Sequence, residues 1–218
     1  MTEQAPASVL RIQAVLITIA LVAGLAIATV HEWTRPMVMA QRGGQLGEAA
    51  LEVIPGAEDY RIYVRTEDDA LRLMGDGDQP ELFIGFDGQG QAVGAALVAS
   101  GMGYADTIQL VYGLDPGQRR LTGMRVVNSR ETPGLGSRIV DDEDFVEGFT
   151  RIELQFAGGQ LKPLAVREEA VHEQGEIDAM TGATVSVDAV ADIINASLAE
   201  WLELLDAHYD ELAGDGRG

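Results

Sequence analysis

Residues 178–186, which read DAMTGATVS, bring three hydroxyl side chains within six positions of one another. They belong to Thr181, Thr184 and Ser186, and Gly182 lies between the first two. Ser and Thr before an apolar segment commonly cap a helix, because their oxygens accept hydrogen bonds from its first free amides. Gly182 gives the backbone the freedom to form the turn that leads into this helix. Taken alone, the stretch therefore predicts the N-terminus of a helix.

Two further stretches combine glycine with polar or aromatic side chains. Residues 129–137 read SRETPGLGS, and their Pro-Gly pair at 133–134 predicts a turn whose backbone amides can face a ligand at close range. Residues 101–107 read GMGYADT and place Tyr104 between two expected strands. A plain loop is the ordinary explanation of the first stretch, and simple packing is that of Tyr104.

The composition narrows the chemistry available to these stretches. The chain has 218 residues, of which 46% are hydrophobic, so it can build one sizeable domain with attachments. It has no cysteine, which excludes thiolate catalysis, cysteine-ligated iron–sulfur clusters and disulfides. The three histidines, His31, His172 and His208, show no zinc or haem spacing, and we expect no metal site. Any redox chemistry must use an organic cofactor.

The charge balance is strongly acidic. Fifteen Lys and Arg residues stand against 35 Asp and Glu residues, which gives a formal net charge of −20. Such a chain is repelled by phosphate backbones and by anionic membrane surfaces, so nucleic-acid binding is disfavoured.

Residues 12–30, IQAVLITIALVAGLAIATV, contain no charged side chain. At about 1.5 Å per residue a helix of this length crosses the roughly 30 Å hydrocarbon core of a bilayer. The alternative is a cleaved signal peptide, with the AIA sequence at 26–28 as its cleavage site. The run exceeds the length of a signal-peptide core, and Trp33 lies where an interfacial aromatic anchors a retained helix. We therefore expect a tail over 1–11 and a transmembrane helix over 12–30.

The charges that flank this helix leave its orientation open. Arg11 precedes it, whereas Arg35 and Arg42 follow it, so the positive-inside rule does not select an inside N-terminus.

The next segment predicts a helical stalk. Residues 37–54 have helical character weakened by three glycines, and the Pro-Gly pair at 55–56 ends it. We assign residues 31–56 to this stalk, 57–213 to one folded domain and 214–218 to a frayed tail.

The domain alternates β-type runs with turns before its last helix. Hairpin turns are predicted at 87–90 and 115–117, and strands over residues 61–65, 81–86, 92–99, 107–112, 121–128 and 161–166. Residues 141–149 have helical character, and 187–212 carry apolar residues at helical spacing, namely Val187, Val190, Ile194, Leu198, Trp201 and Leu205. The sequence thus predicts an α+β domain of antiparallel strands packed with helices.

The stretches GMGYADTIQ, SRETPGLGSRI and DAMTGATVS, in this order behind an N-terminal anchor, resemble the G subunit of the Rnf electron-transport complex. More broadly, the chain is similar to the FMN-binding domain shared with the C subunit of the sodium-translocating NADH:quinone reductase. The resemblance covers nearly the whole chain. Its most specific element is the pattern D-x-x-[ST]-G-A-[ST]-x-[ST], which is met by Asp178, Thr181, Gly182, Ala183, Thr184 and Ser186.

The resemblance implies that FMN is held by a phosphoester bond between its phosphate and the hydroxyl of Thr184. A separate flavin transferase that uses FAD would make this bond, reading a motif formed by Asp178, Thr181, Gly182, Ala183 and Ser186. Thr184 would be a modification site, and no residue of the chain is expected to be catalytic. Gly182 and Ala183 would leave room for the transferase, and a helix that begins near Ser186 would place free amides near the phosphate. Asp178 is assigned to recognition by the transferase, through a metal ion if one takes part, because a carboxylate beside a phosphate is unfavourable.

The resemblance also implies contacts between the cofactor and the two glycine-containing loops. Thr132 would donate a hydrogen bond, and residues 133–136 would shape the wall of the site. The full set of implied cofactor-binding residues is Tyr104, Glu131, Thr132, Pro133, Gly134, Leu135 and Gly136.

The implied function is electron relay within a membrane-bound oxidoreductase that couples oxidation of ferredoxin or NADH to ion movement. The cofactor supplies the chemistry, and no independent catalysis by this subunit is expected. The implied partners are other membrane subunits, with the N-terminus inside and the flavin domain on the outer, periplasmic face of the cytoplasmic membrane. Alternatives are the C subunit of the quinone reductase, a stand-alone FMN-binding electron carrier, and a flavin-free tethered binding module.

Overall fold

The computed structural model describes residues 6–75 and 77–214, and the chain divides into two compact units, Met1–Gly44 and Gln45–Gly218. Helix α1 spans Pro6–Val53 and contributes to both. Its segment Arg11–Val30 is long and apolar enough to cross a membrane, by length and composition. The side chains of residues 11–30 are exposed, as expected of a segment whose apolar surface no other part of its unit covers.

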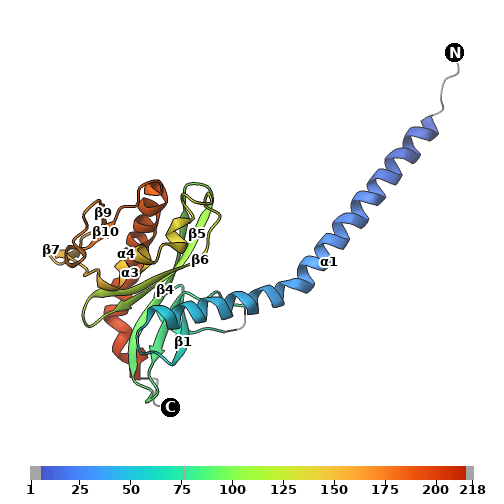
Figure 1. The fold of residues 1–218 in the computed structure, drawn as a ribbon. Helices are drawn as coiled ribbons and strands as arrows, with labels where there is room; N and C mark the ends of the chain where they lie inside the picture. Colours follow the sequence, from blue (N-terminus) through green and yellow to red (C-terminus); the bar gives the residue numbers. More distant parts are fainter. Residues whose placement is uncertain (1–5, 76, 215–218) are drawn as a thin grey trace. The chain divides into compact units, whose positions relative to one another are not determined.

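The second unit is built on a six-stranded antiparallel sheet (Figure 1). Its order is β2-β1-β3-β4-β5-β6. The strands are β1 Asp59–Arg65, β2 Leu71–Leu73, β3 Leu82–Phe86, β4 Ala92–Met102, β5 Thr107–Asp115 and β6 Arg120–Asn128. The predicted turns at 87–90 and 115–117 connect β3 to β4 and β5 to β6. The sequence therefore predicted five of the six strands and both of these hairpins.

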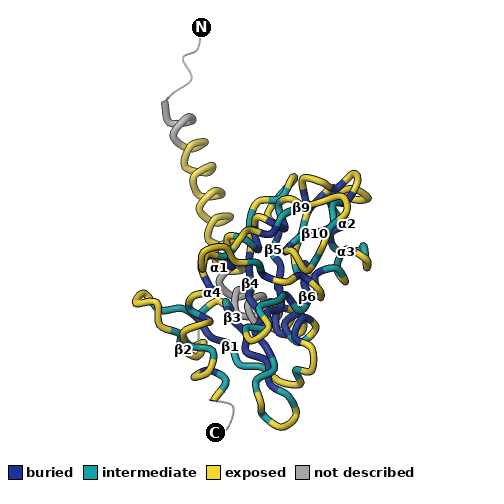
Figure 2. Tube along the Cα trace, turned by 90° about the vertical axis from the view of Figure 1, so that its left-hand side faces the viewer, coloured by how far each residue is buried: buried dark blue, intermediate teal, exposed yellow. Residues whose placement is uncertain are grey.

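Side chains that alternate along the strands form two cores on the two faces of the sheet. Leu97 and Tyr112 belong to the larger core, whereas their neighbours Ala96 and Val111 belong to the smaller one. Every residue of β3 is buried, because both faces of this strand are covered. Figure 2 shows this burial running through the central strands.

Helix α4, Thr184–Gly214, covers the face with the larger core (Figure 1). All six apolar residues predicted to form its inner stripe, Val187, Val190, Ile194, Leu198, Trp201 and Leu205, are buried. Between them, Ser197 accepts a 2.9 Å hydrogen bond from the Tyr112 hydroxyl, so these two buried polar groups satisfy each other.

The last two turns of α1 cover the other face. Residues 45–53, which lie inside the segment expected to be a stalk, bury Leu46, Ala49, Ala50 and Val53 against the sheet. Thr122 Oγ1 donates a 2.6 Å hydrogen bond to the carbonyl oxygen of Val53. A side chain at Gly113 would collide with that same carbonyl, so glycine is what permits this close approach.

The chain between β6 and α4 forms short elements. They are α2 Arg138–Asp141, α3 Glu143–Gly148, the 3₁₀ turn η1 Phe149–Arg151, β7 Phe156–Ala157, β8 Gln160–Leu161, β9 Ala165–Arg167, the 3₁₀ turn η2 His172–Gln174 and β10 Glu176–Asp178. The helix expected over 141–149 is thus divided at Asp142, whose carboxylate caps α3 by accepting from the Phe145 amide. The strand expected over 161–166 is divided at Pro163, which has no N–H to donate. With its antiparallel sheet and packed helices, the domain is of the predicted α+β class.

Candidate functional site

Three segments of the domain converge at one end of the sheet. The register pairs Met102 with Thr107 and Gln109 with Asn128, so β4 ends where β5 begins and β6 ends. The loops 103–106 and 129–137 therefore emerge at the same edge, and Ser186 in the first turn of α4 joins them there through a hydrogen bond to Glu131.

Glu131 is the residue that links these three segments. Its carboxylate is buried, with 6% of the residue exposed. Oε2 accepts a 2.6 Å hydrogen bond from Ser186 Oγ on α4, and Oε1 accepts a 2.9 Å hydrogen bond from the amide of Ala105. A Cβ at Gly103 or Gly136 would collide with this carboxylate, so both glycines leave it room.

The environment of Glu131 favours its ionised form. Burial raises the pKa of the carboxyl group, but hydrogen bonds from Ser186 and from backbone amides of residues 104–106 lower it. The net effect is a pKa below the ordinary value for glutamate. The site therefore contains a buried negative charge whose oxygens accept hydrogen bonds from within the protein.

The 129–137 loop presents its central residues to solvent. Gly134 has φ +75°, and the Leu135 amide donates a 3.1 Å hydrogen bond to the Thr132 carbonyl, which closes the turn predicted from the Pro-Gly pair. Thr132, Pro133, Gly134 and Leu135 are exposed, whereas Gly136 is buried. The loop thus offers a surface for a ligand on one side and supports Glu131 on the other.

The hydroxyls at the start of α4 do not act as the helix caps that their residue types suggest. The helix begins at Thr184, after Ala183. Thr184 Oγ1 donates a 3.5 Å hydrogen bond to the Met180 carbonyl, and Ser186 Oγ donates to Glu131. Two residues along a helix rotate by about 200°. Ser186 therefore faces the interior, where it is buried, while Thr184 is exposed.

Arg138 connects α2 to the turn that precedes Thr184. Its Nη1 donates a 2.9 Å hydrogen bond to the Thr181 carbonyl, and its Nη2 donates a 2.9 Å hydrogen bond to Asp142 Oδ2. The same ion pair holds the pKa of Asp142 below its ordinary value. Gly182 in this turn has φ +85°, a conformation that favours glycine, and a Cβ there would contact Leu135 at 3.6 Å.

Asp178 has a partner of its own. The structure places His172 Nε2 2.7 Å from Asp178 Oδ2, and the Cβ position of Gly148 lies 3.4 Å from the same oxygen. Asp178 is half-buried at the end of β10 and does not join the Glu131 hydrogen bonds. His172 and Arg138 are site residues that the sequence analysis did not identify. Neither residue belongs to the pattern at 178–186, and both contact it only because the chain is folded.

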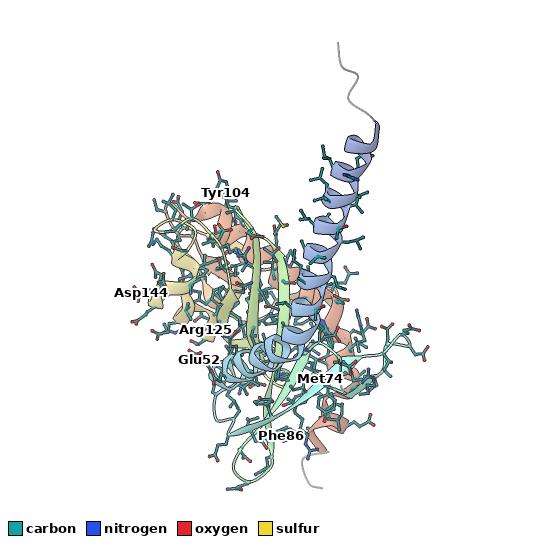
Figure 3. All side chains as sticks on the ribbon, turned by 90° about the vertical axis from the view of Figure 1, so that its right-hand side faces the viewer. Glu52, Met74, Phe86, Tyr104, Arg125 and Asp144 are labelled. Carbon is teal, nitrogen blue, oxygen red and sulfur yellow. The ribbon has the colours of Figure 1, made fainter. Side chains whose placement is uncertain are left out.

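Exposed apolar side chains occur on each of the three converging segments. Tyr104 is 69% exposed at the tip of the β4–β5 hairpin (Figure 3), and Leu135 and Val185 are 51% and 56% exposed. Together with the exposed residue Thr184, these side chains are accessible to an aromatic, phosphate-bearing ligand.

Comparison with known proteins identifies the family. Residues 103–199, which include all three segments, match the FMN-binding domain family. The G subunit of the ion-translocating oxidoreductase complex of Pseudomonas aeruginosa is 33% identical over 178 residues, covering 79% of this chain and 78% of the relative. The chain belongs to the family of G subunits of ion-translocating oxidoreductase complexes. The G subunit of Methanosarcina acetivorans is 29% identical over 185 residues, covering 84% of this chain and 89% of that protein.

Solved structures support the fold of this member of the G-subunit family. The C subunit of the Na⁺-translocating NADH-quinone reductase from Parabacteroides distasonis superposes with a TM-score of 0.56 at 20% identity, covering 68% of this chain and 78% of that one. At 20% identity this structural similarity supports the fold alone. The family resemblance read from the sequence is therefore confirmed, and the FMN-binding domain includes the loops around Thr184.

Proposed function

We propose that this chain is a membrane-anchored electron carrier that holds FMN through a phosphoester bond to Thr184 and relays electrons within an Rnf-type ion-translocating complex. Its family and its FMN-binding domain support the general part of this proposal, which is an FMN electron carrier with an N-terminal apolar helix. The observation that supports Thr184 is its exposure at the first turn of α4, while Ser186 is buried against Glu131.

Attachment would be a transfer from FAD catalysed by a flavin transferase. The Thr184 oxygen attacks the phosphorus on the FMN side of the FAD pyrophosphate, and a new P–O bond forms. The bond between that phosphorus and the bridging oxygen breaks, AMP leaves, and the hydroxyl proton is released to a base of the transferase. The side chain is accessible for such a reaction, and Gly182 and Ala183 beside it add little bulk.

The residues around Thr184 fit the two parts of FMN. The aromatic ring requires apolar surface, which Tyr104, Leu135 and Val185 expose. The phosphate can accept hydrogen bonds from the free amides at the N-terminal end of α4, whose partial positive charge favours an anion. When bound, FMN supplies the electron transfer, and the protein supplies position and electrostatics.

Asp178 is proposed to serve recognition by the transferase. Its carboxylate lies on β10, paired with His172 and apart from the Glu131 hydrogen bonds. Such a position suits a group that is read during maturation and does not contact the finished cofactor.

The apolar segment Arg11–Val30 would tether the flavin domain beside its partner subunits and keep the cofactor at high effective concentration. We propose that the domain lies on the outer face of the cytoplasmic membrane, where a covalent bond prevents loss of FMN by dilution. The alternative, a C subunit of the quinone reductase, is less well supported, because three relatives that match most of the chain at 28–33% identity are G subunits.

Intact-mass analysis of the full chain, co-expressed with a flavin transferase, tests the covalent bond. We expect the wild type to gain the mass of FMN less water, and Thr184→Ala to gain none. Thr150→Ala, which removes an exposed hydroxyl outside the recognition motif, is the control for loss of a hydroxyl and is expected to retain modification at position 184. A wild-type chain that stays colourless and unmodified would favour the flavin-free binding module instead.

A further inference from the structure

Glu131 is a buried charged residue that the attachment chemistry does not use. It lies 47 positions before the pattern that contains Asp178, yet its carboxylate accepts the hydroxyl hydrogen of Ser186, the last member of that pattern. We propose that Glu131 is a positioning residue for the modification of Thr184. Through Ser186 and Ala105 it fixes the first turn of α4 against the 103–106 loop, so that the Thr184 hydroxyl is presented to the transferase. This inference rests on the proposed covalent attachment at Thr184.

The first argument is geometric. Ser186 is 2% exposed and its Oγ lies 2.6 Å from Glu131 Oε2, so a transferase cannot contact this hydroxyl in the folded chain. Thr184, two residues earlier on the same helix, is exposed. A serine that faces inward can affect Thr184 only by setting the position of the turn they share. The hydroxyl that the pattern has at position 186 is then explained by a contact inside the protein.

The second argument concerns rigidity. A hydrogen bond between a hydroxyl and a buried carboxylate is short and strong, and removing one partner leaves the other unsatisfied. Glu131 also receives the Ala105 amide at 2.9 Å, so the same carboxylate restrains two segments at once. The collisions that a Cβ at Gly103 or Gly136 would cause with Glu131 show that both loops close tightly around it. A nucleophile held on such a support samples fewer orientations, which favours its reaction.

The substitutions Glu131→Gln and Ser186→Ala test the proposal in the full-length chain. Purified protein is mixed with FAD and a flavin transferase, and the rate of the FMN mass increment is followed together with amide hydrogen exchange at Ala105. In this reaction the Thr184 oxygen forms a bond to the FMN-side phosphorus of FAD, and AMP is the leaving group. Glu203→Gln, an exposed charge removal on the same helix, is the matched control.

We expect Glu131→Gln and Ser186→Ala each to slow modification by about tenfold, the consequence of one lost buried charged hydrogen bond. The loss should appear mainly in kcat, because the exposed motif residues that the transferase contacts remain. The double variant should be no slower than the slower single variant, since both remove the same contact. Exchange at Ala105 should quicken in Glu131→Gln, and Glu203→Gln should behave as the wild type.

The outcomes separate this inference from the proposed function. A wild-type chain that is never modified contradicts the attachment at Thr184. A modified wild type with variants that react at its rate contradicts the positioning role of Glu131 alone. If Glu131→Gln fails to fold, Ser186→Ala, which removes a single oxygen atom, decides the question. Additive slowing in the double variant would also overturn the proposal, because it would show two independent contacts.

Discussion

Arg138 on α2 donates a 2.9 Å hydrogen bond to the carbonyl oxygen of Thr181, and this bond ties the 129–137 loop to the turn that precedes α4. The second branch of its guanidinium binds Asp142, the capping residue of α3. One planar side chain therefore connects the end of the 129–137 loop, the start of α3 and the turn before α4. Lysine, which carries a single ammonium group, cannot bind two acceptors in the planar, forked geometry of a guanidinium.

Replacing Arg138 by Gln is expected to lower the free energy of unfolding by about 1 kcal/mol, because a partly exposed ion pair and one hydrogen bond are lost. Arg138→Lys should recover only part of this, since lysine cannot reach both acceptors in the same geometry. Urea denaturation of the three proteins measures the differences. Arg130→Gln, which removes a more exposed guanidinium 3.6 Å from Asp106, is the control and should change stability little. Equal stability of Arg138→Lys and the wild type would contradict the bridging role.

Gly113 and Val53 provide a second prediction. Gly113→Ala should destabilise the domain by about 3 kcal/mol, because the new Cβ meets the Val53 carbonyl and either the strand or the end of α1 must shift. Gly117→Ala, in the exposed turn after β5, is the matched control, since its Cβ would find ordinary contact at 3.4 Å. Thermal unfolding in detergent measures both. A Gly113→Ala protein as stable as Gly117→Ala would show that this contact is loose.

The strands and the last helix could be predicted because their signals are local. Runs of β-type residues between turn sequences predicted β1 and β3 to β6, and the spacing from Val187 to Leu205 predicted the buried face of α4. The strand β2, Leu71–Leu73, was missed because three residues at a sheet edge carry no periodicity to read. The prediction of a single strand over 161–166 did not take account of Pro163. Its lack of a backbone N–H can be recognised from the sequence alone.

The site could be predicted only in part, because its contacts join distant residues. The pattern around Thr184 names three hydroxyls without saying which of them face solvent, and helix phase separates the exposed Thr184 from the buried Ser186 only once the buried face is known. The Ser186–Glu131 pair spans 55 positions, and no local signal connects them. No local signal connects Arg138 with the Thr181 carbonyl either, because residue types do not indicate which backbone oxygen will accept a side-chain hydrogen bond. The His172–Asp178 pair spans only six positions, but it depends on the parallel pairing of β9 and β10.

The boundary of the folded domain leads to a truncation prediction. A chain that begins at Gln45 keeps the turns of α1 that fill the smaller core, whereas one that begins at Ala57 exposes Phe83, Ala96 and Val111. Loss of the five buried side chains over 45–54 should lower the free energy of unfolding by on the order of 5 kcal/mol. Circular dichroism with urea titration compares the two chains without detergent. If the chain from Ala57 is as stable as the longer one, the stalk extends to residue 56, as the sequence suggested.

The buried carboxylate of Glu131 predicts a specific pH dependence of stability. Because its pKa is lower in the folded protein than the ordinary value of 4.5, the unfolded state binds more protons between these two values. Glu131 therefore contributes stability that is fully present above about pH 4.5 and is lost as the pH falls through the folded pKa. Glu131→Gln has no such group, so the difference in melting temperature between wild type and variant should be largest near neutral pH and should shrink as the pH falls below about 4.5. Glu203→Gln, measured in parallel, should follow the wild-type curve throughout. A wild-type advantage that grows on acidification would mean that burial outweighs the hydrogen bonds from Ser186 and the backbone amides, and that the pKa of Glu131 is raised.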